Sequence, residues 1–188
     1  MSWLNDCVPD EVVRSVAEID LDALAARGIE GLIIDVDNTL LAHGVREMDP
    51  ERLEWARRAV GRLRVCLLSN SVRGRRARRL SQLLGCPGVS VWDWRRKPFG
   101  GGFRRAMAIT GTAPEHTAMI GDQLVSDVLG GNRAGLHTIW VEPIHPREFV
   151  LTRLVNRRLE RIICERLAVR GVAMPQPAAQ AKEDAGEA

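Results

Sequence analysis

The most informative stretch of this 188-residue chain is Gly-Leu-Ile-Ile-Asp-Val-Asp-Asn-Thr at residues 31–39. It begins as an apolar run, typical of a strand buried on both faces, and it continues into two carboxylates. Short apolar runs predict strands at 31–36, 64–69, 88–92, 117–121 and 136–141. Segments with helical spacing separate them, at 50–63, 74–84, 101–110 and 123–134. This alternation predicts an α/β fold with a five-stranded parallel sheet flanked by helices.

Length and composition indicate a single domain without a membrane span. A chain of this length normally forms one domain. It has no apolar run of about 18 residues, and its N-terminus lacks the pattern of a signal peptide. The four cysteines lie far apart without a CxxC pair, which argues against a zinc site or a disulfide framework. We expect a cytoplasmic protein, or one bound peripherally at the inner face of the membrane.

The ends of the chain differ from its middle. We expect one domain over residues 1–170, with an N-terminal helical extension at 1–30 and an amphipathic basic helix at 148–170. Residues 171–188 contain few large apolar side chains, which predicts a disordered tail. Residues 46–105 carry sixteen basic and five acidic side chains. A basic surface of this kind attracts phosphorylated ligands, anionic lipid or nucleic acid.

Asp35 and Asp37 follow the first predicted strand. Parallel α/β sheets bind ligands at the carboxyl ends of their strands, where these residues lie. Carboxylates held this close together are stabilised by a hard cation with oxygen ligands, and Mg²⁺ fits. An aspartate is also a competent nucleophile for phosphoryl transfer. Taken alone, the pattern fits a pair of solvated loop aspartates equally well.

Polar residues also follow the next strands. Ser69 and Asn70 end the strand at 64–69, where a hydroxyl and an amide can bind phosphate oxygens or merely form a turn. Lys97 follows the third strand and can neutralise phosphate charge or lie on the surface. Asp122 follows the fourth strand and is either a metal ligand or a helix N-cap. Asp127, five residues later, can support the metal site.

These four signals occur in the order found in the haloacid dehalogenase (HAD) superfamily. That superfamily carries DxDx[T/V], then Ser or Thr, then Lys, then GDxxxxD on a Rossmann-like sheet. The chain resembles it through residues 35–39, Ser69, Lys97 and residues 121–127. The resemblance implies that Asp35 attacks phosphorus and forms an aspartyl-phosphate, while Asp37 acts as general acid and then general base.

The resemblance also implies roles for the remaining site residues. Mg²⁺ would be held by Asp35, the main-chain carbonyl of Asp37 and Asp122, with Asp127 orienting the metal site. Ser69 and Asn70 would bind phosphate oxygens, and Lys97 would brace both the nucleophile and the phosphate. Each interval between the motifs is filled by one helix and one strand, so we expect no cap domain and an open site. An open site suits macromolecular or membrane-borne phosphates.

A narrower resemblance, over about residues 3–170, is to the YqeG family of HAD subclass IIIA. It rests on Val8-Pro9-Asp10-Glu11, on Lys97-Pro98 with Phe103, on the run at 121–133 and on His137-Thr138-Ile139. Some members of that family are phosphatidylglycerophosphate phosphatases, which implies an anionic phospholipid substrate at the membrane surface. The alternatives are a capless phosphatase for soluble or nucleic-acid-end phosphates, with nucleic acid less favoured, and a non-catalytic scaffold or regulatory module.

The sequence allows two roles for each of three surface features. The arginines at 73–79 either steer an anionic lipid surface or nucleic-acid backbone towards the site or form a solvated helix face. The helix at 148–170 either lies on a membrane or, as we favour, packs its apolar stripe on the domain. Trp92 and Trp94 are either interfacial anchors or part of a strand core.

Overall fold

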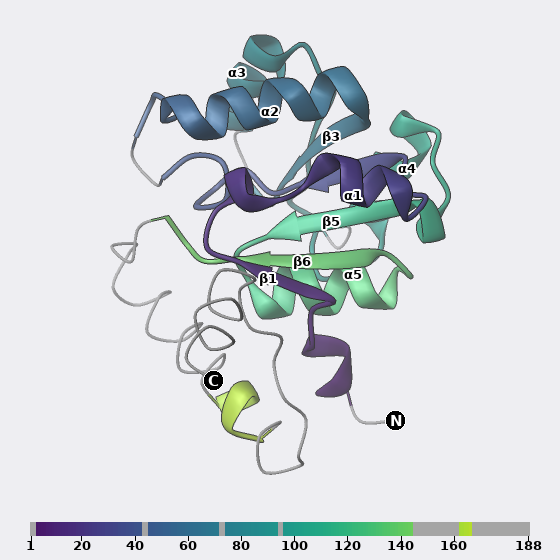
Figure 1. The fold of residues 1–188 in the computed structure, drawn as a ribbon. Coiled ribbons are helices and arrows are strands. Elements are labelled where there is room, and N and C mark those ends of the chain that lie inside the picture. The colour runs from purple at the N-terminus through teal and green to yellow at the C-terminus, as the bar shows by residue number, and fades with distance from the viewer. Residues whose placement is uncertain (1–2, 43–44, 72–73, 94–95, 145–161, 167–188) are drawn as a thin grey trace, which may run out of the picture.

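The computed structural model describes residues 3–42, 45–71, 74–93, 96–144 and 162–166. Its centre is a parallel sheet (Figure 1). The six strands of the sheet have the order β1-β6-β5-β2-β3-β4. The strands are β1 Glu11–Val13, β2 Gly31–Ile34, β3 Arg64–Ser69, β4 Gly88–Ser90, β5 Thr117–Gly121 and β6 His137–Val141. The predicted α/β fold with a parallel sheet is confirmed, with one strand more than expected.

Helices cover both faces of the sheet. The α-helices are α1 Leu21–Ala26, α2 Pro50–Arg62, α3 Arg75–Leu84, α4 Gly101–Thr110 and α5 Gly130–Arg133. Three short 3-10 helices, η1 Asn5–Cys7, η2 Val16–Glu18 and η3 Pro114–His116, and a π-helix, η4 Leu124–Leu129, complete the described elements. Between β2 and β3, and between β3 and β4, the described residues contain no element besides α2 and α3 respectively, so no cap domain interrupts the sheet there.

The side chains of β2 show why both faces must be covered. Successive residues of a strand point to opposite faces. Leu32 and Ile34 are fully buried in the core with α1, α2 and α3, whereas Ile33 is fully buried in a second core with α4. The uninterrupted apolar run in the sequence is therefore the signature of a strand at the centre of a layered domain.

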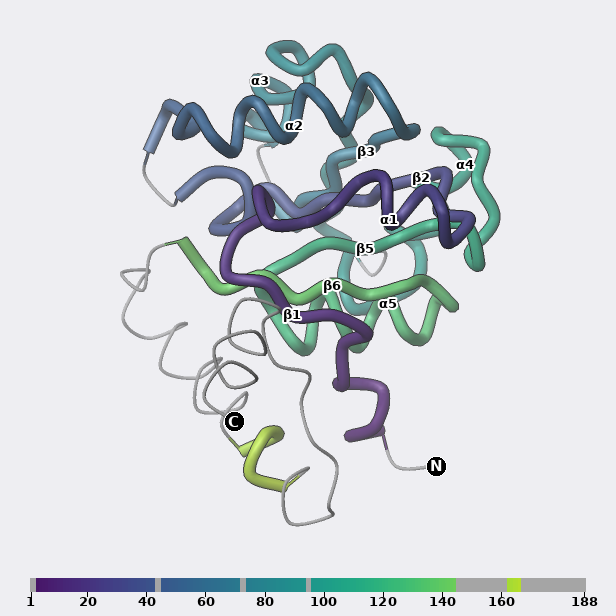
Figure 2. The backbone as a smooth tube through the Cα atoms, in the orientation of Figure 1, coloured from purple at the N-terminus to yellow at the C-terminus, as the bar shows by residue number. Residues whose placement is uncertain are grey.

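The sixth strand lies in the segment that we predicted to be helical. Residues 11–13 form edge strand β1 beside β6 (Figure 2). Glu11 lies opposite Ile139. Val12 and Val13 are buried, and β-branched residues favour strands. The helical extension expected at 1–30 is therefore wrong for β1, although helical turns do form after it, at η2 and α1.

The C-terminal predictions fall mostly outside the described residues. Residues 162–166 are helical, and Ile163 is fully buried against Leu4, Leu124 and Val128. The rest of the helix predicted at 148–170, and the tail predicted at 171–188, lie outside the described part of the chain. Among the described residues, no helix is both long and apolar enough to cross a membrane.

Candidate active site

The site lies at the carboxyl ends of the central strands, as the sequence predicts. Asp35 follows β2, Ser69 ends β3 and Asp122 follows β5, and β2 pairs with both other strands. The main chain turns back directly after Asp35, because the amides of Leu40 and Leu41 both donate to Val36 O. This tight turn keeps the first motif folded over the end of the sheet.

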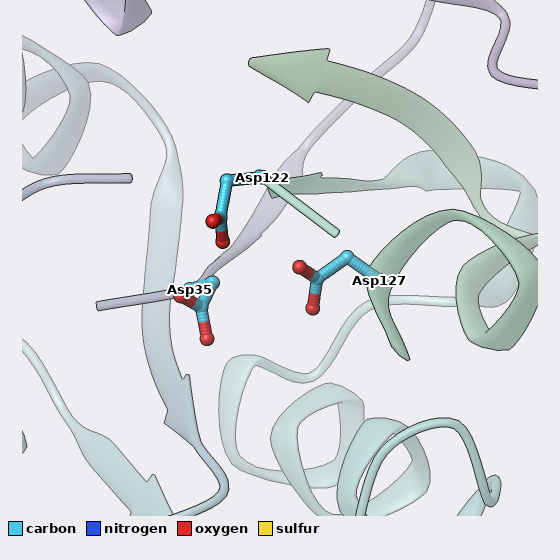
Figure 3. Close-up of side chains that lie close together, drawn as sticks. All are labelled: Asp35, Asp122 and Asp127. Atoms are coloured by element: carbon cyan, nitrogen blue, oxygen red, sulfur yellow. The ribbon is translucent and has the colours of Figure 1, made fainter. Parts of the chain in front are cut away.

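Three carboxylates converge at this edge. Asp35, Asp122 and Asp127 are all buried, and each offers an oxygen within 4.8 Å of the others (Figure 3). Gly121 makes this approach possible, since a Cβ at that position would lie 2.3 Å from Cγ of Asp127. The π-helix η4 carries Asp127 and follows β5 after two residues; such π segments occur often at functional sites.

Lys97 lies between two of these carboxylates. Its Nζ is 2.5 Å from Oδ1 of Asp35 and 2.6 Å from Oδ1 of Asp127, and its side chain is almost fully buried. Asn70 fixes the main chain of Lys97 from both sides: its Oδ1 accepts from Lys97 N at 2.9 Å, and its Nδ2 donates to Lys97 O at 3.1 Å. The amide of Asn70, which we predicted to bind phosphate, thus holds the lysine loop in this structure.

The electrostatics of the group favour a bound cation. Burial, partly offset by Lys97 and reinforced by the nearby Asp127, raises the pKa of Asp35 to about 7. Burial alone would lower the pKa of Lys97, but Asp127 and Asp35 outweigh it and raise that pKa. In the fully ionised state, three carboxylates and one ammonium would leave two surplus negative charges in a buried site. A divalent cation with oxygen ligands balances them.

Asp37 stands apart from the acidic group. Its Oδ1 is 2.5 Å from Nη1 of Arg76, and its Oδ2 is 3.5 Å from the hydroxyl of Ser69, which donates to it. Arg76 also donates from Nη2 to the main-chain oxygens of Leu41, at 3.2 Å, and Ala42, at 2.5 Å. A half-buried arginine of α3 therefore links the second aspartate of the first motif to the loop that follows it.

Comparison with known proteins agrees with this geometry. A family model described as HAD-hydrolase-like matches residues 94–143. The probable phosphatase YqeG of Bacillus subtilis is 37% identical over 165 residues, which make up 87% of this chain and 93% of that protein. The chain belongs to the YqeG-type family of HAD phosphatases. It is therefore an enzyme, and the non-catalytic alternative is set aside.

One further relative and one solved structure extend the comparison of this HAD phosphatase. Phosphatidylglycerophosphate phosphatase 1 from the chloroplast of Chlamydomonas reinhardtii is 31% identical over 178 residues, covering 89% of this chain and 65% of that protein. The solved structure of a HAD-like family hydrolase from Porphyromonas gingivalis superposes with a TM-score of 0.50 at 16% identity, covering 68% of this chain and 98% of that one. The similarity to this solved structure supports the assignment of the fold.

Several motif residues of the phosphatase prove to be structural. Asp10 accepts hydrogen bonds from the amide of Thr138 at 2.7 Å and from its hydroxyl at 3.2 Å. Asn132 accepts from the same hydroxyl at 2.9 Å and donates to the main-chain oxygens of Asp6 and Val8. These bonds tie the N-terminal segment to β6 and α5. They join the motifs at 8–11, 132–133 and 137–139, which lie far apart in the sequence.

Arg76 is the site residue that sequence reasoning missed. It is one of five arginines at 73–79, and the pattern alone does not distinguish it from its neighbours. Its position at the second residue of α3, whose N-terminus lies near the end of β3, is the signal that was present in the sequence. Trp92 is exposed, at 59%, rather than part of a strand core, because β4 ends at Ser90; Trp94 lies outside the described residues.

Proposed function

We propose that this HAD phosphatase is a Mg²⁺-dependent phosphomonoesterase that works through an aspartyl-phosphate on Asp35 and acts on phosphatidylglycerophosphate. The observation that carries the chemistry is the Asp35 carboxylate, held against Lys97 beside two further buried carboxylates. Asp35 and Asp122, with the main-chain carbonyl of Asp37, would hold the ion, and Asp127 would orient the metal site. When bound, Mg²⁺ would offset the charge of the transferring phosphoryl group.

The reaction has two steps, with Asp35 as nucleophile and Asp37 as the proton carrier. A carboxylate oxygen of Asp35 attacks phosphorus, the bond from phosphorus to the ester oxygen breaks, and Asp37 gives a proton to the leaving alcohol. Asp37, now ionised, then takes a proton from water as the water oxygen attacks phosphorus. The bond to Asp35 breaks, and inorganic phosphate leaves with the carboxylate restored.

The other site residues position these groups. Lys97 orients the Asp35 carboxylate and offsets phosphate charge, while Asp127 holds Lys97 from the opposite side. Asp127 also accepts a hydrogen bond from Gln123 N at 3.0 Å, so its second oxygen is fixed as well. Ser69 lies within reach of Asp37 and offers a hydroxyl to phosphate oxygens. Asn70 acts chiefly by holding the main chain of Lys97.

Two features support a phospholipid substrate. The sheet carries no cap in the described residues, so a substrate embedded in a membrane can reach the site. The loop that carries Lys97 exposes Trp92 and Phe99, at 59% and 57%, and the guanidinium of Arg96 lies 6.0 Å from the Trp92 ring centroid. Exposed aromatic rings beside a cation suit the interface of an anionic membrane, where aromatic side chains sit at headgroup level. A peripheral location on the membrane is therefore part of the proposal.

The test is Mg²⁺-dependent phosphate release from phosphatidylglycerophosphate in mixed micelles, beside a panel of soluble phosphomonoesters, with Asp35→Asn as the inactive control. We expect a kcat/KM far higher for the lipid than for the panel, and no release by the control. Equal or better turnover of soluble or nucleic-acid-end phosphates would support the proposed reaction but show that phosphatidylglycerophosphate is not the preferred substrate. Phosphate release by Asp35→Asn would contradict the assignment of Asp35 as the nucleophile.

A further inference from the structure

A small pocket is connected to Asp37 through residues that contact both. It has a volume of about 150 Å³ and is lined by Leu41, Val45, Arg46, Arg76, Arg79 and Leu80. Arg76 connects the two places, because the same guanidinium pairs with Asp37 and donates to the main-chain oxygen of the pocket residue Leu41. Asp37 is itself bridged to Leu41 through the main chain. Arg76 and Leu41 therefore join the pocket to Asp37.

The proposed chemistry tells which part of a substrate would face this pocket. A general acid must lie against the leaving oxygen that it protonates. If Asp37 is that acid, the leaving alcohol extends past Asp37, and the groups attached to it meet the residues next to Asp37. One of those residues is Arg76, which also lines the pocket together with Arg46 and Arg79.

The pocket carries more positive than negative charge. It offers three guanidinium groups, and among the described residues the only ion pair made by any of them is that of Arg76 with Asp37. Arg46 and Arg79 are exposed, and both are charged, since arginine is protonated throughout the physiological range. Guanidinium groups match the oxygen geometry of phosphates. The buried Leu41 and Leu80 add an apolar wall suited to a carbon chain.

We propose that this pocket binds a second phosphate group, a phosphodiester carried on the leaving alcohol, and thereby selects substrates that bear one. The inference deepens the proposed function and rests on it, because phosphatidylglycerophosphate carries such a diester three carbons from the phosphate that is removed. Arg46 and Arg79 contact the diester, Arg76 places Asp37 beside the bond that breaks, and the apolar wall packs on the glycerol between the two phosphates.

The test compares two soluble substrates that need no membrane. Glycerophosphoglycerophosphate, the deacylated lipid headgroup, carries the diester, whereas glycerol 3-phosphate lacks it. We expect wild-type kcat/KM to favour the former, and Arg46→Gln and Arg79→Gln each to lower that preference about tenfold, as for the loss of one charge-assisted hydrogen bond. Arg75→Gln removes an equal charge from α3 outside the pocket and should keep the wild-type preference. An unchanged preference in both pocket variants would overturn the proposal.

A second readout separates this inference from the proposed substrate. Glycerophosphoglycerol, the alcohol product, should inhibit the hydrolysis of p-nitrophenyl phosphate, and its inhibition constant should rise about tenfold in Arg79→Gln but not in Arg75→Gln. Inorganic phosphate should inhibit all variants alike, because it binds at Asp35. If the lipid is turned over but the inhibition constant of glycerophosphoglycerol is the same for wild type and Arg79→Gln, the pocket assignment is wrong. If the lipid and its deacylated headgroup are not turned over at all, the proposed substrate and the pocket assignment both fail.

Discussion

Asn70 offers a sharp test of how the lysine loop is built. Its amide makes two hydrogen bonds to the main chain of Lys97, at 2.9 and 3.1 Å, and Asn70→Ala removes both. At about 1 kcal/mol for each bond, we expect a loss of about 2 kcal/mol in the free energy of unfolding. Because Lys97 would no longer be held against Asp35, we also expect kcat to fall about 10- to 100-fold, as for a displacement near 1 Å at a reacting centre.

The assay separates positioning from phosphate binding. Steady-state kinetics on p-nitrophenyl phosphate should show the loss in kcat, with KM nearly unchanged, and urea unfolding should give the change in stability. Asn70→Asp keeps the acceptor for Lys97 N but loses the donor to Lys97 O, so it should lie between alanine and wild type. Asn5→Ala, at an exposed asparagine in η1, serves as the matched control. A raised KM with normal kcat would show that Asn70 contacts phosphate instead, and would refute the argument.

Three further outcomes are expected. Gly121→Ala should destabilise the fold by about 1–3 kcal/mol and reduce turnover, because the new Cβ meets the carboxylate of Asp127; thermal melting beside wild type measures this. In the native enzyme, a thiol reagent at pH 8 should modify Cys164 first, since burial raises the pKa of three other thiols to about 11 or 12, namely those of Cys7, Cys66 and Cys86; rapid reaction of all four would be contrary to this. The hydrogen bond with His137 lowers the pKa of Glu11 in the folded protein, despite burial. The ionised carboxylate of Glu11 therefore adds stability to the fold at pH values above its unfolded pKa near 4.5. This stability is lost as the pH falls through the lower pKa of the folded state. Denaturant titrations should therefore find Glu11→Gln less stable than wild type at pH 6, and the difference in the free energy of unfolding should shrink at lower pH. A difference that stays constant with pH would contradict the proposed link between Glu11 ionisation and stability.

The sequence predicted the centre of the molecule better than its edge. Residues 31–34 and 117–121 are apolar runs buried on both faces, and in a chain of alternating elements such runs are specific to the central strands of a covered sheet. Strand β1 has three residues, which is too short for its periodicity to separate strand from helix. Its formation depends on pairing with β6, a partner more than 120 residues away, and no local pattern reports that contact.

In the site, too, some residues are placed by their local sequence and others by contacts with distant parts of the chain. The positions of Asp35 and Asp122 are set by the ends of β2 and β5, so the motif order was enough to predict their approach. The contact of Arg76 with Asp37 depends on the start of α3 and on the path of the loop after β2. Likewise, the two bonds from Asn70 to Lys97 join segments 27 residues apart, and they exist because β3 and β4 lie side by side.

The most direct test of the account is to trap the covalent intermediate. The enzyme would be mixed with Mg²⁺ and substrate, quenched in acid during turnover, reduced with borohydride and digested, and residue 35 examined by mass spectrometry. The account predicts that Asp35 is converted to homoserine in samples that contained substrate, that Asp37 is not, and that Asp35→Asn shows neither the conversion nor turnover. Turnover without any modification at residue 35, or a modification at Asp37 in its place, would contradict the assignment of Asp35 as the nucleophile.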